Sequence, residues 1–310
     1  MGTTDGSHSA GIAISESLDE GHTWRHSVIR KAPENCTFAT GPVPIVEKDG
    51  FIFRAMEMWC DVYQWPQSFL SLVLGASIDS NLTDPESWAL SPTQGFQKSF
   101  IPGWMPRPVI SGGFLEGNAV DMRGGGLGVL LRCRVYDVTQ RSYTLQQACL
   151  FEVANWRALG GGAGANTSDV NMVWQGFVDM PGGGNKFTVR YDEPSDLYLA
   201  LSNPSIDRYG KNPDARNILT LIYSRDLLSW RIAATVDMPD DGLPWDASLM
   251  QTSFMYVDWR VDGDDLLLAI RTAFDGARSF HDSNYITFKR LDNFRALLPP
   301  KAQPTEQGVA

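Results

Sequence analysis

The chain has 310 residues, of which 43% are hydrophobic and 20% charged, so it can bury a core and is not globally disordered. Its formal net charge of −10 argues against binding to nucleic-acid phosphates or to anionic membranes. No apolar run is long enough to span a membrane, and residues 1–6 lack the basic and apolar regions of a signal peptide.

The first predicted element is a strand at Gly11–Glu16, followed by a polar turn that ends at Trp24. The same succession of strand, polar turn and Trp returns three times along the chain. The later copies cover residues 70–88, 149–156 and 217–230. A repeat of this kind indicates a fold built from similar units rather than one irregular core.

Hairpins precede the later copies, because pairs of apolar runs with period-2 alternation flank glycine-rich or Asp-Gly turns. They cover residues 43–54, 118–132, 187–201 and 256–270. A hairpin and a strand–turn–strand unit together make one four-stranded blade, and we count about five, the first incomplete. The sequence therefore predicts an all-β, single-domain β-propeller over residues 1–298, no helix, and a disordered tail at 299–310.

The turn after the first strand reads Ser17-x-Asp19-x-Gly21-x-Thr23-Trp24, which resembles the Asp box of sialidases and other propeller glycosidases. Most of the chain is similar to the sialidase-like, BNR-repeat proteins. The segments that carry this similarity are 115–120, 181–190, 256–259 and 281–288. The resemblance implies a sialidase-type propeller with six blades in its fuller form, of which this chain is an N-terminally truncated version.

The resemblance also implies that the Asp box is structural. Asp19 and Ser17 are expected to bind backbone N–H groups of the turn, and Trp24 to pack between blades. Asp79 and Asp226, in the degenerate copies, are given the same role.

Charged and polar side chains converge at one mouth of the predicted propeller, because inner strands start and second strands end there. These residues are Thr37, Thr40, Arg54, Glu57, Glu116, Asn118, Arg132, Arg134, Lys186, Thr188, Asn203, Tyr256, Asp258, Arg271, His281, Asp282 and Asn284. The alternative interpretation is a set of structural ion pairs around a water-filled channel. Trp59, Trp65 and Trp104 are a sugar-stacking platform or, alternatively, packing residues.

Glycoside hydrolysis ordinarily needs two carboxyl groups, and Glu116 with Asp258 is the preferred pair, with Glu57 and Asp282 in reserve. A sialidase-like alternative uses Tyr256 as a nucleophile helped by Glu116. His281 is a candidate base in a polysaccharide lyase. The substrate-binding candidates are Arg54, Arg132, Arg271, Lys186, Asn118 and Asp282. The N-terminal arginine motif of sialidases has no match here.

The sequence thus predicts an exo-acting, sialidase-like glycoside hydrolase acting on a terminal, possibly acidic sugar. A non-catalytic propeller that binds glycans or proteins, and a lyase acting on uronic-acid glycans, are the alternatives. We expect a monomer without cofactor or metal ion, and the family resemblance implies a secreted or periplasmic location. Cys133 and Cys149 lie in apolar strands and are expected to be buried free thiols.

Overall fold

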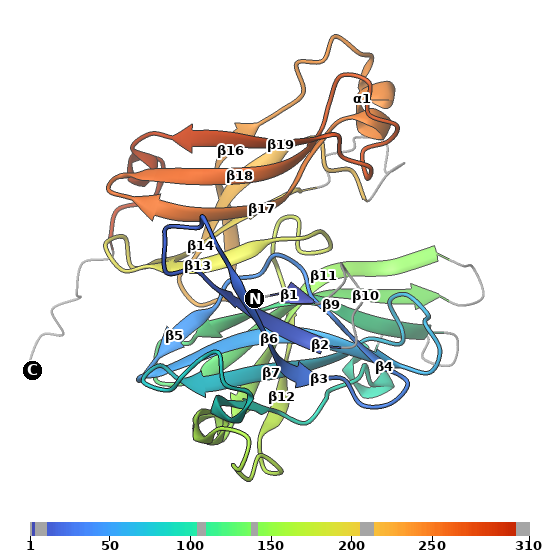
Figure 1. Cartoon of the computed structure of the whole chain (residues 1–310). Coiled ribbons are helices and arrows are strands. Elements are labelled where there is room, and N and C mark those ends of the chain that lie inside the picture. Colours follow the sequence, from blue (N-terminus) through green and yellow to red (C-terminus); the bar gives the residue numbers. More distant parts are fainter. Residues whose placement is uncertain (1, 4–10, 104–109, 138–141, 205–213, 302–310) are drawn as a thin grey trace, which may run out of the picture.

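The computed structural model describes residues 2–3, 11–103, 110–137, 142–204 and 214–301 (Figure 1). The fold is all-β and is a β-propeller, as predicted, with four blades distinguished in it. The strands are β1 Gly2–Thr3, β2 Gly11–Glu16, β3 Arg25–Lys31, β4 Cys36–Ala39, β5 Val46–Lys48, β6 Phe51–Cys60, β7 Leu70–Ser77, β8 Trp88–Leu90, β9 Ile110–Asp121, β10 Leu127–Asp137, β11 Ser142–Ala154, β12 Asn171–Val178, β13 Thr188–Asp192, β14 Leu197–Ser202, β15 Leu219–Ser224, β16 Trp230–Asp237, β17 Ser253–Asp262, β18 Asp265–Ala273 and β19 Tyr285–Leu291.

Five antiparallel sheets follow one another along the chain. Their strand orders are β1-β2-β3, β4-β6-β7-β8 with β5 also paired to β6, β9-β10-β11-β12, β13-β14-β15-β16 and β17-β18-β19. Each predicted hairpin is present, as β5/β6, β9/β10, β13/β14 and β17/β18. The first strand of a sheet therefore begins near the centre and the others step outward, which is the blade arrangement of a propeller.

The hydrophobic core is divided into layers between successive sheets, because each strand alternates its side chains between two faces. Ile12 and Ile29 of the first sheet pack on Leu72 and Leu74 of the second. Similar clusters join the second sheet to the third, the third to the fourth and the fourth to the fifth. This sheet-by-sheet packing fixes the inner strands relative to one another, and so positions the side chains at their starts.

The turn after β2 uses its carboxylate structurally. Asp19 accepts hydrogen bonds from the backbone N–H and the hydroxyl of Thr23, at 2.8 and 2.6 Å, as expected. Asp226 likewise accepts hydrogen bonds from the backbone N–H groups of Leu228 and Ser229, between β15 and β16. The prediction that Trp24 packs between blades is wrong: Trp24 is 54% exposed and its indole N–H donates to the carbonyl of Gly21. Its counterparts Trp88 and Trp230 are buried.

The expectation of no helix is also wrong. The short helix α1, Trp245–Gln251, follows Pro244 and lies at one end of the β17–β19 sheet (Figure 1). It joins two sheets, so its sequence carries no strand alternation, and seven residues are too few for a clear helical period. In the described part of the chain, 3-10 turns occur at Pro85–Ser87, Lys98–Phe100, Trp156–Gly161 and Phe294–Leu297. Across the described residues, we find no helix with the length and apolar character to cross a membrane.

The cysteines divide into two kinds. Cys36 and Cys60 are directly paired across β4 and β6 and form a disulfide, which the sequence reasoning did not anticipate. Cys133 and Cys149 are buried free thiols, as predicted. The disulfide ties the short first strand of the second sheet to its longer neighbour, close to the point where the chain enters the candidate site.

Candidate functional site

Two β-bulges of the same form bring Glu116 and Tyr256 to the centre of the propeller. In β9, Glu116 and Gly117 together oppose Leu131 of β10, and the pairing register shifts there. In β17, Tyr256 and Val257 oppose Ile270 of β18 in the same way. Glu116 and Tyr256 adopt left-handed φ values of 52° and 51°. Such strain at non-glycine residues is typical of functional sites, where it redirects a side chain.

The strand register places equivalent residues of four sheets around one point. Thr40 directly follows β4, and Lys186 lies two residues before β13, so both are next to the inner strands of their own sheets. In the two bulged sheets, the second strands contribute Arg132 and Arg271, which pair with the residue before each bulge. We call the eight residues the axial ring: Thr40, Glu116, Lys186 and Tyr256 from or next to inner strands, and Glu57, Arg132, Asn203 and Arg271 from or next to second strands. All eight were among the residues predicted to converge.

Glu116 is the centre of the contacts in this ring. Arg132 Nη1 donates to Glu116 Oε2 at 2.5 Å, and the Tyr256 hydroxyl hydrogen-bonds to the same carboxylate. Burial alone would raise the pKa of Glu116, but Arg132 and Lys186 hold it below its ordinary value. Burial and the charge of Glu116 raise the pKa of Tyr256. Glu116 is therefore an ionised carboxylate that accepts a hydrogen bond from the protonated hydroxyl of Tyr256. This is the arrangement of a nucleophile and its base.

Lys186 and Glu57 are buried beside this pair. Burial lowers the pKa of Lys186 to about 8, although Glu116 opposes the shift, and the ammonium donates to Thr188 Oγ1 at 3.0 Å. Burial raises the pKa of Glu57 to about 8, against the hydrogen bond that it accepts from Gly117 N at 2.8 Å. Gly41 packs closely against both side chains, since a Cβ there would lie 3.1 Å from Glu116 and 3.2 Å from Lys186 and would displace them.

The raised pKa of Glu57 predicts a pH dependence of stability. Glu57 gains a proton more readily in the folded chain, so the free energy of unfolding falls as pH rises from about 4.5 to about 8, by at most about 1 kcal/mol per pH unit. Lys186, whose folded pKa is lowered, acts with the opposite sign and only above about pH 8. We expect Glu57→Gln to remove the decline, as measured by urea unfolding at pH 5, 6, 7 and 8. An unchanged slope in the variant would assign the decline to other groups.

Two further guanidinium groups lie against the ring of Tyr256. Arg271 is 5.3 Å and Arg216 is 5.6 Å from the ring centroid. Arg132 Nη2 and Arg216 Nε are buried and have no hydrogen-bond partner among the residues that the structure describes. Such donors favour an anionic ligand, because an unpaired buried N–H is costly. Sequence reasoning missed Arg216, which lies in a loop before β15 where no strand pattern identifies it.

A pocket of about 490 Å³ opens next to these groups. It is lined by Thr40, Gly41, Pro42, Glu116, Tyr256, Asp258, Ala269, Ile270, Arg271 and Ile286. Its size suits a monosaccharide or a small oligosaccharide. Within the described residues, no three His, Cys, Asp or Glu side chains converge in a way that could hold a metal ion.

Several predicted site residues have structural partners instead. Arg54 donates to the carbonyls of Val43 and Gly41 at 2.8 and 3.2 Å, so it holds the segment between β4 and β5. Asn118 joins β9 to β13 through Phe187 O and Val189 N. Asp258 is 54% exposed and pairs with Arg190 at 2.8 Å rather than with a group of the axial ring.

His281 and Asp282 lie on an exposed loop after β18. The imidazole of His281 is 61% exposed and contacts Asp282 at 3.2 Å, while Asp282 also pairs with Arg278. The loop reaches the axial ring through the carbonyl of His281, which accepts a hydrogen bond from Arg271 at 2.6 Å.

The predicted tryptophan platform is only partly described. The Arg134 guanidinium lies 5.1 Å from the ring of Trp65, and Trp59 packs edge-on against Tyr63 at 5.2 Å. Trp104 lies outside the described residues. Arg134 also pairs with Asp214, a residue that sequence reasoning did not single out, at 2.5 Å.

No protein-family model matches the sequence, and no curated protein matches it. Solved structures do resemble the fold. The α-L-arabinanase of Penicillium chrysogenum in complex with arabinobiose is 12% identical, with a TM-score of 0.47, and the match covers 93% of this chain and 69% of that one. The β-fructofuranosidase catalytic domain of Microbacterium saccharophilum is 10% identical, with a TM-score of 0.48, and the match covers 80% and 59%.

The sialidase of Trypanosoma rangeli, in complex with the inhibitor DANA, is 11% identical with a TM-score of 0.39. This match covers 90% of the present chain and 50% of the sialidase. At such identities the similarity concerns the arrangement of strands and does not extend to activity. The chain spans half to about two thirds of the length of these three proteins.

Proposed function

We propose that the protein is a sialidase-like glycoside hydrolase that acts on a terminal sugar bearing a carboxylate. The observation that carries this proposal is the hydrogen bond between the Tyr256 hydroxyl and Glu116, with Arg132 paired to the same carboxylate. A neutral tyrosine is a weak nucleophile, and an adjacent ionised carboxylate is the base that activates it. Arg216 and Arg271 lie beside the phenol and can bind the planar carboxylate of the sugar.

The reaction balances with these residues and water. In the first step, Tyr256 Oη bonds to the anomeric carbon and its proton passes to Glu116. The aglycone leaves with the electrons of the broken bond and takes a proton from water. In the second step, water bonds to the anomeric carbon, the tyrosine oxygen leaves and recovers its proton from Glu116, and one proton returns to the solvent. An aryl aglycone is a good leaving group and needs little help from an acid.

The geometry favours the tyrosine–carboxylate pair over Glu116 with Asp258, because Asp258 is paired with Arg190. Glu57 is a poor candidate for direct attack, since it is buried and binds Gly117 N. Its raised pKa instead keeps a second negative charge away from Glu116 at neutral pH.

The test is a screen of the purified chain against aryl glycosides of N-acetylneuraminic acid, glucuronic acid, galactose and arabinose. We expect release of the aryl group from an acidic glycoside and none from the neutral ones. Ultraviolet absorbance of an unsaturated uronate, formed from an acidic polysaccharide and abolished by His281→Ala, would instead support a lyase. A folded sample that binds an acidic sugar but releases no product would identify a binding protein and overturn the proposal.

A further inference from the structure

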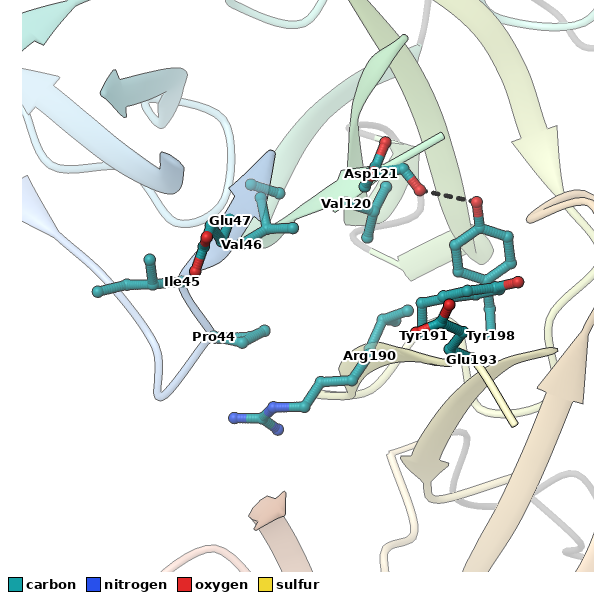
Figure 2. Close-up of a pocket in the computed structure, with 12 residues that line it drawn as sticks. Pro44, Ile45, Val46, Glu47, Val120, Asp121, Arg190, Tyr191, Glu193 and Tyr198 are labelled. Carbon is teal, nitrogen blue, oxygen red and sulfur yellow. Dashed lines mark hydrogen bonds between the residues drawn. The ribbon is translucent and has the colours of Figure 1, made fainter. Parts of the chain in front are cut away.

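A second pocket of about 350 Å³ lies at the other end of the inner strands (Figure 2). It is built from β5, the last residues of β9, and β13 with the turn that follows it. Its lining consists of Pro44, Ile45, Val46, Glu47, Ala119, Val120, Asp121, Val189, Arg190, Tyr191, Glu193 and Tyr198. None of these residues belongs to the axial ring, so the pocket is separate from the proposed catalytic site.

Asn118 and Thr188 are buried polar residues of the inner strands that line neither pocket. Asn118 bonds across to β13, and Thr188 Oγ1 donates to Val257 O of β17 at 2.7 Å. Both side chains are fully buried. Along β9, Ala119 lies three residues beyond Glu116, which is roughly 10 Å of strand. The two pockets share no lining residue, and the ion pair between Arg190 of the second pocket and Asp258 of the first lies between them.

Tyr191 forms one wall of the pocket and is held rigidly. Its ring is 39% exposed, yet its hydroxyl donates to Asp196 Oδ1 at 2.5 Å. The guanidinium of Arg123 lies 5.8 Å from the ring centroid, and the ring of Tyr198 lies 5.1 Å away. An exposed aromatic ring that is already fixed loses little conformational entropy when a ligand stacks on it.

The opposite wall is aliphatic. Figure 2 shows Pro44 across the open space from Tyr191 and Glu193, with Val120 between them on the side of β9, while the side chain of Ile45 points away from that space. Ile45 is exposed although its side chain is apolar. An aromatic wall, an aliphatic wall and a few polar groups at the edge suit a ligand that has C–H faces and hydroxyls.

The charges at the edge favour a neutral ligand. Lys48 pairs with Asp121 at 2.6 Å and Asp258 pairs with Arg190 at 2.8 Å, so these four charges compensate each other. Glu47 and Glu193 form no ion pair with any residue in the described part of the chain. The uncompensated charge is therefore negative, which repels an acidic sugar and offers acceptors to hydroxyl groups.

We propose that this pocket is a second carbohydrate site, which binds one neutral pyranose of a glycan against the ring of Tyr191. The two ends of the propeller then differ in specificity. Arginines bind an anionic sugar at the end that holds the axial ring, and carboxylates bind a neutral sugar at the end that holds Tyr191. This inference does not depend on the proposed hydrolase activity.

The test is saturation-transfer NMR followed by titration, with the methyl glycosides of glucose, galactose, mannose and N-acetylglucosamine and with N-acetylneuraminic acid. We expect at least one neutral glycoside to bind the wild type. Tyr191→Ala should weaken that binding at least about fivefold, whereas Tyr191→Phe, which keeps the ring, should stay within about twofold. Tyr285→Ala removes an exposed tyrosine outside this pocket and is the matched control.

The proposal is overturned if no neutral glycoside binds at about 50 mM, where even a Kd of about 10 mM gives high occupancy. It is equally overturned if Tyr191→Ala binds as well as the wild type, or if Tyr285→Ala and Tyr191→Ala lose binding alike. Thermal unfolding of the three variants shows that each is folded. Release of aryl groups from acidic glycosides should be unaffected by Tyr191→Ala, so failure here and failure of the proposed function are distinguishable.

Discussion

Replacing Tyr256 with phenylalanine is expected to lower kcat on an acidic aryl glycoside by about 10³-fold or more, with little change in KM. The substitution removes only the hydroxyl that hydrogen-bonds to Glu116. The phenyl ring stays in contact with Arg216 and Arg271, whose cation–π contacts need only the aromatic face. The variant should therefore remain folded and bind the sugar, which separates loss of chemistry from loss of structure. The measurement is steady-state release of the aryl group.

Two further variants make this result specific. Glu116→Gln keeps the shape of the side chain but cannot accept the phenolic proton, so it should also lose most of kcat. The double variant should lose little more than either single one, because the two residues act as a unit. If Asp258→Asn abolished turnover while Tyr256→Phe retained more than about a tenth of it, Glu116 and Asp258 would be the catalytic pair and our assignment would be wrong.

The strands and hairpins of this chain could be predicted because they depend on local patterns. Apolar alternation predicts a strand from neighbouring residues alone, and an Asp-Gly turn, such as Asp262-Gly263 between β17 and β18, predicts a hairpin in the same way. The structural role of Asp19 was implied by the resemblance of its turn to the Asp box. The helix α1 and the disulfide between Cys36 and Cys60 did not follow, since the helix is too short for a period and the pairing needs the register of β4 on β6.

The sequence predicted which residues converge at the candidate site, but it did not predict which of them contact each other. Strand starts and ends indicated that Glu116, Arg132, Lys186 and Tyr256 converge. Which of them bond to each other depends on the two bulges, and a bulge leaves no clear mark in a single sequence. The sequence also could not separate Arg54, which binds backbone carbonyls, from Arg132, which binds a carboxylate.

The repeated bulges suggest how a propeller forms such a site. Four of the five sheets each offer one position at the inner strand and one at the second strand to the central space, so a change of residue at these positions changes its chemistry without changing the backbone. Here the second-strand positions hold Glu57, Arg132, Asn203 and Arg271, a carboxyl, two guanidiniums and an amide. Substrate specificity can then vary by side chain alone, while the packing between sheets supplies the rigidity.

The ion pair between Arg132 and Glu116 is the basis of the second prediction, which concerns the stability of the fold. Arg132→Met is expected to lower the free energy of unfolding by about 3–5 kcal/mol at pH 8, because it leaves the buried Glu116 carboxylate without its strongest partner. Removing that positive charge also raises the pKa of Glu116, since the coulombic attraction of Arg132 is what opposes the effect of burial. Glu116 then binds a proton more readily in the folded variant, so the loss of stability should shrink as pH falls toward 5.

Urea unfolding of the wild type, Arg132→Met, Glu116→Gln and the double variant at pH 5 and pH 8 measures these effects together. The double variant contains neither charge, so it should recover most of the stability that Arg132→Met loses at pH 8. A loss that is the same at both pH values and is not recovered by Glu116→Gln would mean that Arg132 contributes only packing. Because Glu116 must be ionised to take the proton of Tyr256, Arg132→Met should also shift the pH optimum of aryl-glycoside hydrolysis upward, a change that a purely structural role of Arg132 would not produce.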